Sequence, residues 1–264
     1  AILVKKRATN YPLEYIINKA SFYGEMFIVK EGVLIPRPET EILVENAIEI
    51  LKDKKEPIKV LEIGTGSGGI ASYFTRKSEM SFDVVAIDVV DSRTVQDDYQ
   101  FLLVDGTKIP FNDKAFDVII TNHVIEHVGE YDDQLKHLFE VKRVLKKDGV
   151  AYLAVPNRWM LVEPHYRLIF LSWLPQKYRS RYLKKIRNID FYDCEPLEKK
   201  QLENLLNAAG FSYQNRTIQA LRIFLEDEKE QHRLLNMMFL FVPNFLLKLF
   251  LGITPTLIYT LRNK

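Results

Sequence analysis

A glycine-rich segment carries the most specific chemistry in the sequence. It follows a short β-branched run and reads Glu62-Ile63-Gly64-Thr65-Gly66-Ser67-Gly68-Gly69. Where side chains are missing, backbone N–H groups at the start of a helix can approach a bound anion. The segment therefore predicts a nucleotide-like ligand. Because Gly64, Gly66 and Gly69 also satisfy the dinucleotide pattern G-x-G-x-x-G, the loop alone does not identify that ligand.

Two acidic residues stand where a nucleotide would need them. Asp88 ends the second apolar run, the one that follows the loop, and a carboxylate there can accept hydrogen bonds from both hydroxyls of a ribose. Asp105-Gly106 closes the third run, although Asp-Gly is also a common turn. An NAD-linked oxidoreductase would use Asp88 in the same way, so both classes of enzyme stay open at this point.

Histidines gather after the fourth apolar run. Asn122 and His123 end it, and Glu126 and His127 follow at once. Either histidine could act as a general base, since the imidazole pKa lies near neutrality. The alternative is a helix start that caps or packs without chemistry.

A second polar group follows the fifth run. Arg158, His165, Tyr166 and Arg167 lie where ligands bind in α/β proteins, which predicts that Arg158, His165 and Tyr166 line an acceptor pocket. Surface packing is an equal alternative. We interpret Cys194 as an incidental thiol, because no neighbour in the sequence would activate it.

The elements that must position these residues alternate between β-prone and helical patterns. This alternation is typical of βαβ units and predicts an α/β, doubly wound, Rossmann-like sheet. A helix is expected over residues 131–147, ending in Lys147-Asp148-Gly149. Strands are expected at residues 59–63, 83–88, 100–104, 116–121 and 150–155.

Further segments surround this sheet. A small arm, residues 1–52, contains a hairpin around Tyr23-Gly24-Glu25 and a helix reaching Leu51, and residues 53–264 form the main domain. Helical insertions are expected after strand 5, at residues 159–190, and between strands 6 and 7, at residues 226–253. Between and after them we expect a helix at 198–209, closed by Gly210, and strands at 211–218 and 256–261, giving seven strands with helices on both faces.

Several motifs resemble the class I methyltransferases related to ubiquinone-biosynthesis enzymes. They are Ile109-Pro110-Phe111, Glu126-His127-Val128, Arg143-Val144-Leu145-Lys146 and Val155-Pro156-Asn157-Arg158. The resemblance implies S-adenosylmethionine as cofactor and S-adenosylhomocysteine as product. It implies that the glycine loop surrounds the methionine moiety, that Asp88 holds the ribose and that Asp105 meets the adenine. The implied cofactor residues are Glu62, Gly64, Thr65, Gly66, Gly68, Asp88, Asp105, Gly106 and Asn122.

A second resemblance covers the N-terminal arm. Phe22-Tyr23-Gly24 and Ile35-Pro36-Arg37-Pro38-Glu39-Thr40-Glu41 look like the linker of release-factor glutamine N5-methyltransferases. That family follows the fourth strand with Asn-Pro-Pro-Tyr, which grips the planar amide, whereas this chain has Asn122 and then His123-Val124-Ile125. The second resemblance therefore leaves protein-glutamine methylation as an alternative to a small-molecule or lipid acceptor.

The resemblance to quinone O-methyltransferases also bears on metal binding. A related Glu-His pair in those enzymes helps bind a divalent metal, so His123, Glu126 and His127 form an alternative metal site. We expect none, and assign His127 and His123 to catalysis. A non-catalytic protein that binds S-adenosylmethionine is a further alternative.

Composition limits the partners. The formal charge of +2 gives no field that favours nucleic acid. One cysteine excludes an internal disulfide and, with an N-terminal apolar run too short for a signal peptide, predicts a cytoplasmic protein. We expect the apolar stretch at residues 234–253 to form a buried helical lid, and the basic run from Lys177 to Arg187 to form a solvated helix face. The alternatives for the apolar stretch are a membrane-surface or lipid-substrate patch, which the basic run would support, and a dimer contact.

Overall fold

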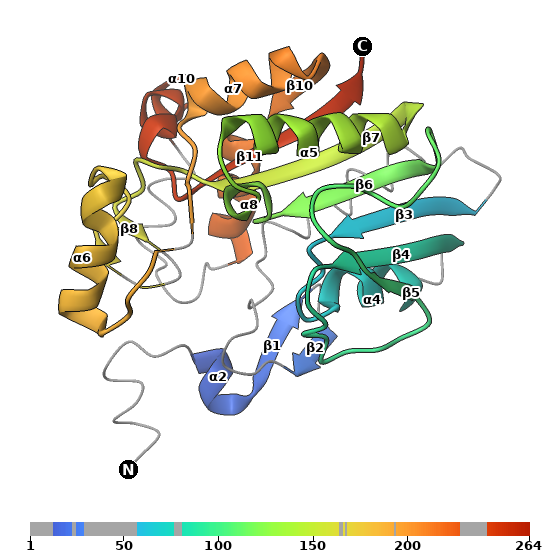
Figure 1. The fold of residues 1–264 in the computed structure, drawn as a ribbon, viewed down its shortest axis with the longest axis horizontal. Coiled ribbons are helices and arrows are strands. Elements are labelled where there is room, and N and C mark those ends of the chain that lie inside the picture. The colour runs from blue at the N-terminus through green and yellow to red at the C-terminus, as the bar shows by residue number, and fades with distance from the viewer. Residues whose placement is uncertain are drawn as a thin grey trace. The chain divides into compact units, whose positions relative to one another are not determined.

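The computed structural model describes residues 13–22, 25–28, 57–76, 81–163, 166, 168–192, 194–227 and 242–264. The chain divides into two compact units, residues 1–105 and 106–264, which we take in turn. Figure 1 labels their helices and strands.

The first unit opens with a short helix and a hairpin. Helix α2 (Leu13–Ile17) precedes strands β1 (Lys19–Phe22) and β2 (Glu25–Ile28), which pair antiparallel with Phe22 opposite Glu25. The hairpin expected around Tyr23-Gly24-Glu25 is therefore present. The helix expected up to Leu51 lies outside the described residues.

The rest of this unit supplies three parallel strands. They are β3 (Ile58–Ile63), β4 (Phe82–Asp88) and β5 (Gln100–Leu103), with helix α4 (Gly69–Arg76) between the first two. Strand β3 is buried at every position except Lys59, because a parallel strand is covered on both faces. The glycine loop connects its carboxyl end to α4.

The second unit supplies four strands and the helix α5 (Tyr131–Val144). Strands β6 (Phe116–Asn122) and β7 (Leu145–Pro156) run parallel, and β11 (Thr256–Asn263) pairs antiparallel with both β7 and β10 (Phe211–Asn215). The whole sheet has seven strands in the order β10-β11-β7-β6-β3-β4-β5. The predicted seven-stranded α/β fold is confirmed.

One boundary differs from the prediction. Helix α5 ends at Val144 instead of continuing to residue 147, and β7 begins at Leu145, whose backbone is already extended. Leu145 pairs with Phe116 across a register shift, and the Lys146 ammonium lies 2.9 Å from the buried Asp117 carboxylate. These contacts hold the polar run in the strand although its composition is typical of a turn.

The insertion after β7 is more than a helix. Strands β8 (Val162–Glu163) and β9 (Leu168–Ile169) form a short hairpin before helix α6 (Gln176–Arg187). A small core joins them to the following loop, and Arg179, expected on a solvated basic face, is instead buried, 3.1 Å from Glu195. The core residues are Leu168, Leu171, Leu183, Tyr192 and Cys194.

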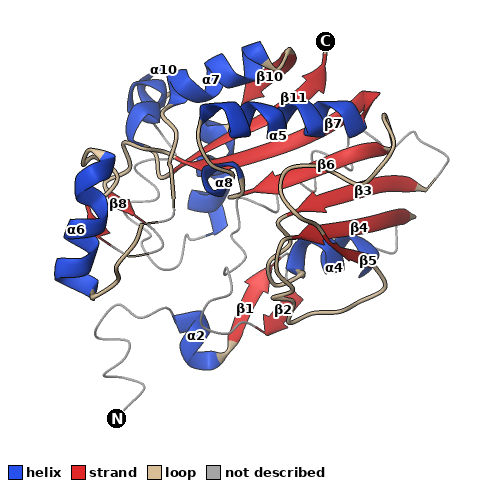
Figure 2. Cartoon of the chain, viewed as in Figure 1, coloured by secondary structure: helices blue, strands red, loops and turns tan. Residues whose placement is uncertain are grey.

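The C-terminal elements complete the second unit. Helix α7 (Lys199–Ala208) begins with a capping box at Glu198 and lies beside α5 (Figure 2), where Lys142 donates hydrogen bonds to the carbonyls of Ala209 and Gly210. Strand β10 stops at Asn215, not at 218, because the Asn215 side chain accepts the Thr217 N–H and starts helix α8 (Thr217–Asp227).

The expected apolar lid is described only in part. Residues 228–241 lie outside the described residues, and the remainder forms α10 (Asn244–Leu247) and the 3-10 helix η3 (Lys248–Ile253). Within the described residues, every helix is too short or too polar to cross a membrane.

Candidate functional site

The glycine loop has the geometry that its sequence predicts. Gly64, Gly66 and Gly68 all have positive φ, at 71°, 51° and 82°, a region open to glycine with little strain. A Cβ on Gly68 would lie 2.6 Å from the Val95 carbonyl, so packing alone requires glycine there. A Cβ on Gly66 would meet nothing within 4 Å, which leaves open space beside the loop.

Glu62 ties this loop to helix α4. The side chain is 2% exposed, and its Oε2 accepts hydrogen bonds from Thr65 Oγ1 at 2.6 Å and Ala71 N at 3.0 Å. Burial raises the pKa of Glu62 to about 8, and the two hydrogen bonds oppose that shift. The Thr65 hydroxyl, expected at the cofactor, is thus engaged with Glu62.

Asp88 lies against the same loop. Its Oδ2 accepts the Gly66 N–H at 2.9 Å, and its Oδ1 accepts the Val89 N–H at 2.7 Å. The carboxylate at the end of β4 is therefore fixed beside the open space at Gly66. Asp105 is exposed just after β5, and Gly106 next to it has a φ of 71°.

In the second unit, the exit of β6 holds a buried acid–imidazole pair. Asn122 ends the strand, and His123 has a φ of 57°, in the left-handed region that residues other than glycine rarely adopt. His123 Nδ1 lies 3.3 Å from Glu126 Oε1, and Glu126 is 1% exposed. Neither Glu126 carboxylate oxygen has a hydrogen-bond partner among the described residues.

Two more potential ligand groups surround Glu126. The ligand atoms of Glu126, His127 and Cys194 all lie within 4.8 Å of one another. A backbone hydrogen bond from Glu195 N to Glu126 O, 2.9 Å, brings the cysteine-bearing loop to this place. Carboxylate, imidazole and thiolate together form a set that zinc accepts. No sequence pattern indicates a role for Cys194, because it is distant along the chain from the other two residues.

His137 was also missed by the sequence analysis. It lies on α5 and is fully buried, and burial lowers its pKa to about 4 against the opposing charge of Glu126. His137 is therefore neutral at neutral pH and does not compensate the Glu126 carboxylate.

The structure describes only two of the residues that we expected at the acceptor, Arg158 and Tyr166. The Arg158 guanidinium lies over the Trp159 ring, 5.5 Å from its centroid. The Tyr166 N–H donates to Glu163 Oε2 at 2.7 Å, and the Tyr166 ring lies 5.7 Å from that of Tyr192. His165 and Arg167 lie outside the described residues. Tyr166 thus joins the insertion core that also holds Cys194.

A family model described as "Methyltransferase domain" matches residues 39–215, two thirds of the chain. The chain belongs to this methyltransferase domain family. The predicted class I methyltransferase, with S-adenosylmethionine as its cofactor, is confirmed. The NAD-linked and non-catalytic alternatives therefore lose their basis.

Similar proteins are known in bacteria and archaea. A release factor glutamine methyltransferase of Enterococcus faecalis is 44% identical over 81 residues, 31% of this chain and 28% of that protein. One from Rhodopirellula baltica is 34% identical over 148 residues, 50% of this chain and 49% of that protein. The chain spans less than half the length of these curated relatives.

Among solved structures, a SAM-dependent methyltransferase from Methanosarcina mazei is 19% identical with a TM-score of 0.44, covering 66% of this chain and 87% of that one.

These relatives overturn one expectation. We expected a small-molecule or lipid acceptor, and gave membrane-surface contact through the C-terminal apolar stretch as an alternative to a buried lid. The relatives are instead named for a glutamine of a release factor, which is a protein. The predictions of a small-molecule or lipid partner and of membrane-surface contact are therefore wrong.

Proposed function

We propose that this methyltransferase transfers the methyl group of S-adenosylmethionine to a side chain of a protein. The observation that carries the proposal is the glycine loop, with Asp88 and Glu62 bonded to it, in a chain of the methyltransferase family. The protein acceptor is supported by the names of relatives that are 34–49% identical over parts of the chain.

The first unit supplies most of the cofactor residues in this proposal. Gly64, Gly66 and Gly68 would face the methionine moiety, since a positive φ and the open space at Gly66 let the backbone approach a ligand. Asp88 would hold the ribose, and Asp105 with Gly106 the adenine. When bound, the cofactor supplies an electrophilic methyl group on a positively charged sulfur.

The second unit supplies the acceptor residues. We assign His123 as the general base and Glu126 as the residue that orients it, because the two side chains lie 3.3 Å apart and are both buried. A neighbouring carboxylate also stabilises the imidazolium that forms when His123 takes a proton. His127 is the second candidate for the base, Asn122 is proposed to contact the cofactor, and Arg158, His165 and Tyr166 are proposed to line the acceptor pocket.

The acceptor atom is the finer part of the proposal. Glutamine of a release factor is the first candidate, because the relatives are named for it. The exit of β6 nevertheless reads Asn122-His123-Val124-Ile125, without the proline and tyrosine that the resemblance associates with a planar amide. A base beside the acceptor suits a nucleophile that must lose a proton before or during the transfer.

Labelled S-adenosylmethionine tests both the protein acceptor and the identity of the methylated side chain. The full chain is incubated with a purified bacterial release factor and, separately, with a bacterial protein extract, and the methylated residue is located by peptide mass spectrometry. Label on a glutamine supports the relatives' acceptor, and label on another side chain supports a protein acceptor of different chemistry. Label confined to material of low molecular weight would overturn the protein acceptor. Absence of label from every fraction, despite cofactor binding, would contradict methyl transfer itself.

A further inference from the structure

The insertion that follows β7 exposes a group of large apolar side chains. Single exposed apolar residues are normal, but a contiguous group of them marks a contact surface. Strands β8 and β9 and the loops beside them carry this group, and α6 lies alongside (Figure 2). Its members, here called the apolar patch, are each more than a third exposed: Trp159, Leu161, Val162, Ile169, Phe170 and Trp173.

The β8–β9 hairpin turns its apolar side chains outward. Val162 and Ile169 are opposite each other and are 48% and 56% exposed, whereas both members of the next pair, Glu163 and Leu168, are buried. Directly opposite residues share one face of an antiparallel pair. The hairpin therefore buries a face that includes a carboxylate and exposes a face of two aliphatic side chains. A partner that covers the exposed face would account for this arrangement.

Ring contacts join the hairpin to the two tryptophans. Phe170 directly follows Ile169, and its N–H donates to the Leu161 carbonyl at 2.9 Å. The Trp173 ring centroid lies 4.9 Å from that of Phe170 and 5.6 Å from that of Trp159. The exposed apolar side chains therefore form one continuous surface.

The two indoles present hydrocarbon to the surface. Trp173 Nε1 donates to the Met160 carbonyl at 2.8 Å, and Trp159 Nε1 donates to Glu198 Oε2 at 3.1 Å. The rings also meet edge to face, at 85° between the two indoles and 63° between Trp173 and Phe170. Surfaces that bind single-stranded nucleic acid use ring faces as platforms for stacked bases. The apolar patch is therefore better suited to the side chains of a protein.

Helix α6 adds positive charge beside the apolar patch. The Tyr182 hydroxyl of α6 donates to the Ile169 carbonyl at 3.4 Å, which places the helix against β9. The helix contains six basic residues and no acidic one. Arg179 and Lys184 are ion-paired. The other four have no ion pair with a described residue: Lys177, Arg181, Lys185 and Arg187.

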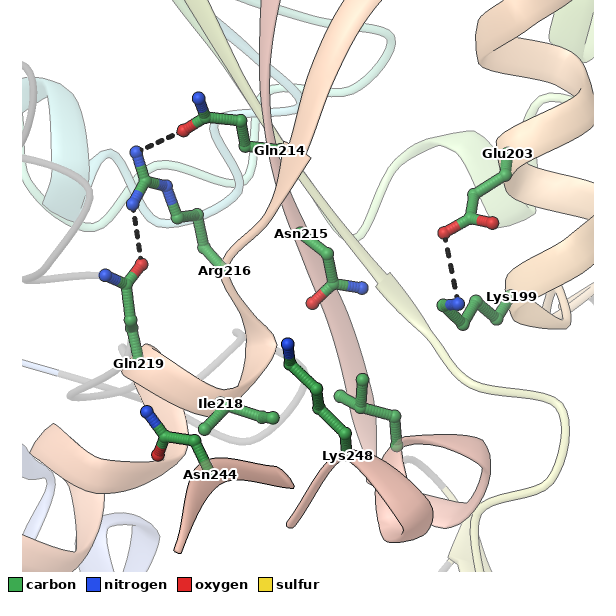
Figure 3. A pocket seen from close by; sticks show the side chains of 10 residues that line it. Lys199, Glu203, Gln214, Asn215, Arg216, Ile218, Gln219, Asn244 and Lys248 are labelled. Atoms are coloured by element: carbon green, nitrogen blue, oxygen red, sulfur yellow. Dashed lines mark hydrogen bonds and ion pairs between the residues drawn. The ribbon is translucent and has the colours of Figure 1, made fainter. Parts of the chain in front are cut away.

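The basic residues at the end of β10 provide a contrast (Figure 3). Lys199 lies 3.4 Å from Glu203, and it is therefore ion-paired. Arg216 donates to the amide oxygens of Gln214 and Gln219. Neighbours in the second unit thus hold both of these cations. The four α6 cations without an ion pair are exposed instead, so their charges are available to an acidic partner.

The apolar patch adjoins the proposed acceptor site at two places. Leu168 and Cys194 belong to one buried core beneath the hairpin, and the Cys194 sulfur lies within 4.8 Å of a Glu126 carboxylate oxygen. The Trp159 ring lies beside the Arg158 guanidinium, which is proposed to line the acceptor pocket. A protein bound on the apolar patch would therefore lie next to the side chains proposed to act on it.

We propose that this insertion is the docking surface for the acceptor protein, which binds it through a segment that combines apolar side chains with Asp or Glu. The inference rests on the proposed function, because it names how the protein acceptor of that same site is held. The apolar patch would bury the apolar side chains, and the α6 cations would attract the acidic ones. A second copy of this chain bound by two-fold symmetry would instead bring the two α6 helices together, and their like charges would repel.

Steady-state methylation of the acceptor protein tests the apolar patch. The acceptor is the purified release factor or, where the bacterial extract shows label on another protein, that protein after purification. Phe170→Asn should raise KM for the acceptor at least about tenfold and leave kcat within about twofold, because only uniform binding is lost. The variant should fold, since Phe170 is exposed and asparagine tolerates its φ of 59°.

The matched control for this variant is Phe139→Asn. Phe139 lies on α5, outside the insertion, and is 48% exposed, close to the 47% of Phe170. Its KM should stay within about twofold of wild type, as for most surface substitutions. A short synthetic peptide that carries only the methylated side chain and its neighbours should be methylated equally by wild type and Phe170→Asn, which shows that the site of transfer is intact.

Lys185→Glu tests the positive charge. It should raise KM about fivefold at low ionic strength, and the rise should shrink in about 0.5 M salt because exposed charges are screened. Lys200→Glu provides the control of equal charge change, since Lys200 is an exposed lysine of α7 outside the insertion.

The remaining outcomes overturn the proposal. A wild-type KM in both Phe170→Asn and Lys185→Glu would remove the docking surface while methyl transfer to a protein stands. Equal rises in the control variants would mean a general effect of substitution or charge. An unchanged KM with lost binding to phosphatidylglycerol vesicles or single-stranded RNA would assign the surface to lipid or RNA, and a wild-type dimer that Phe170→Asn dissociates would assign it to a second copy. Absence of label from every protein would refute the proposed function first, and the docking surface with it.

Discussion

Each of the two units of this methyltransferase holds a buried glutamate beside a proposed site. Glu62 and Glu126 are 2% and 1% exposed, each just beyond or at the carboxyl end of a parallel strand. Glu62 accepts hydrogen bonds from a hydroxyl and a backbone N–H. Glu126 has a nearby imidazole, but neither of its oxygens accepts a hydrogen bond from a described residue.

The difference indicates what each glutamate is for. The Glu62 carboxyl already accepts hydrogen bonds within the protein, so we assign it a structural role. It holds in place the loop whose backbone would face the cofactor. A buried polar group without a hydrogen bond lowers the stability of the fold by about 1–3 kcal/mol or more. We therefore infer that such a group is retained for a functional role. The arrangement at Glu126 is suited to gaining a proton-bearing or cationic partner during function.

Removing the base pair should give the largest change in rate. We expect His123→Ala to lower turnover about 100-fold, since a positioned general base contributes 10²- to 10⁴-fold. Glu126→Gln should lower it less, because it acts through His123. Single-turnover measurements with labelled cofactor provide the rate, and binding of S-adenosylhomocysteine should be unchanged. A His123→Ala enzyme with wild-type turnover would remove His123 as the base.

The opposite pattern is expected at the cofactor loop. Asp88→Asn should weaken binding of S-adenosylhomocysteine about 10- to 100-fold, because hydrogen bonds to a charged group contribute about 1.5–3 kcal/mol. Asp83→Asn on the same strand provides the control, since Asp83 is largely exposed and faces Lys59 at 3.9 Å. Calorimetry measures both. Equal affinity of Asp88→Asn and wild type would refute the assignment of Asp88 to the ribose.

The comparison also shows what sequence can reveal. The glycine loop and Asp88 are close in sequence to the strands that carry them, so local spacing located both. Strand β7 was misjudged at its start because the Lys146–Asp117 ion pair and the register of Leu145 are long-range contacts. Local composition does not encode such contacts.

The group formed by Glu126, His127 and Cys194, here called the Glu126 cluster, was predictable only in part for the same reason. His123, Glu126 and His127 are adjacent in sequence and were recognised together. Cys194 reaches them through the fold of the insertion and the Glu195–Glu126 backbone hydrogen bond, and His137 through the packing of α5. Neither residue has a neighbour in sequence that would indicate its role.

Zinc binding tests the contrast between Glu62 and Glu126, with an effect smaller than those expected for His123 and Asp88. We expect the Glu126 cluster to bind zinc, because Glu126, His127 and Cys194 bring carboxylate, imidazole and thiol within 4.8 Å. Cys194→Ser should weaken zinc binding at least about tenfold, since a hydroxyl is a much poorer ligand than a thiolate. Calorimetry on the full chain at pH 7.5 measures this, with chelator-treated protein as the starting material. Identical zinc affinity in wild type and Cys194→Ser would exclude the cysteine from the cluster's ligands.

The smallest expected effect is a dependence of stability on pH. Burial raises the pKa of Glu62 from 4.5 to about 8, so the folded state keeps a proton that the unfolded state releases. Its contribution is therefore fully present below pH 4.5 and is lost as pH rises toward 8. His137 acts in the opposite direction, because burial lowers its pKa from 6.5 to about 4, and stability rises between those values. The two contributions oppose each other up to pH 6.5, and above it the effect of Glu62 remains.

The Glu62→Gln variant isolates the contribution of Glu62 to the pH dependence of stability above pH 6.5. Glutamine resembles the protonated acid and can still accept hydrogen bonds from Thr65 and Ala71. Between pH 6.5 and pH 8, wild type should lose about 1 kcal/mol more of its free energy of unfolding than the variant does, within the limit of about 1.4 kcal/mol per pH unit for one proton. Urea unfolding at the two pH values measures the difference. An identical loss in both proteins would mean that Glu62 is ionised in the folded state, and the contrast with Glu126 would then rest on hydrogen bonding alone.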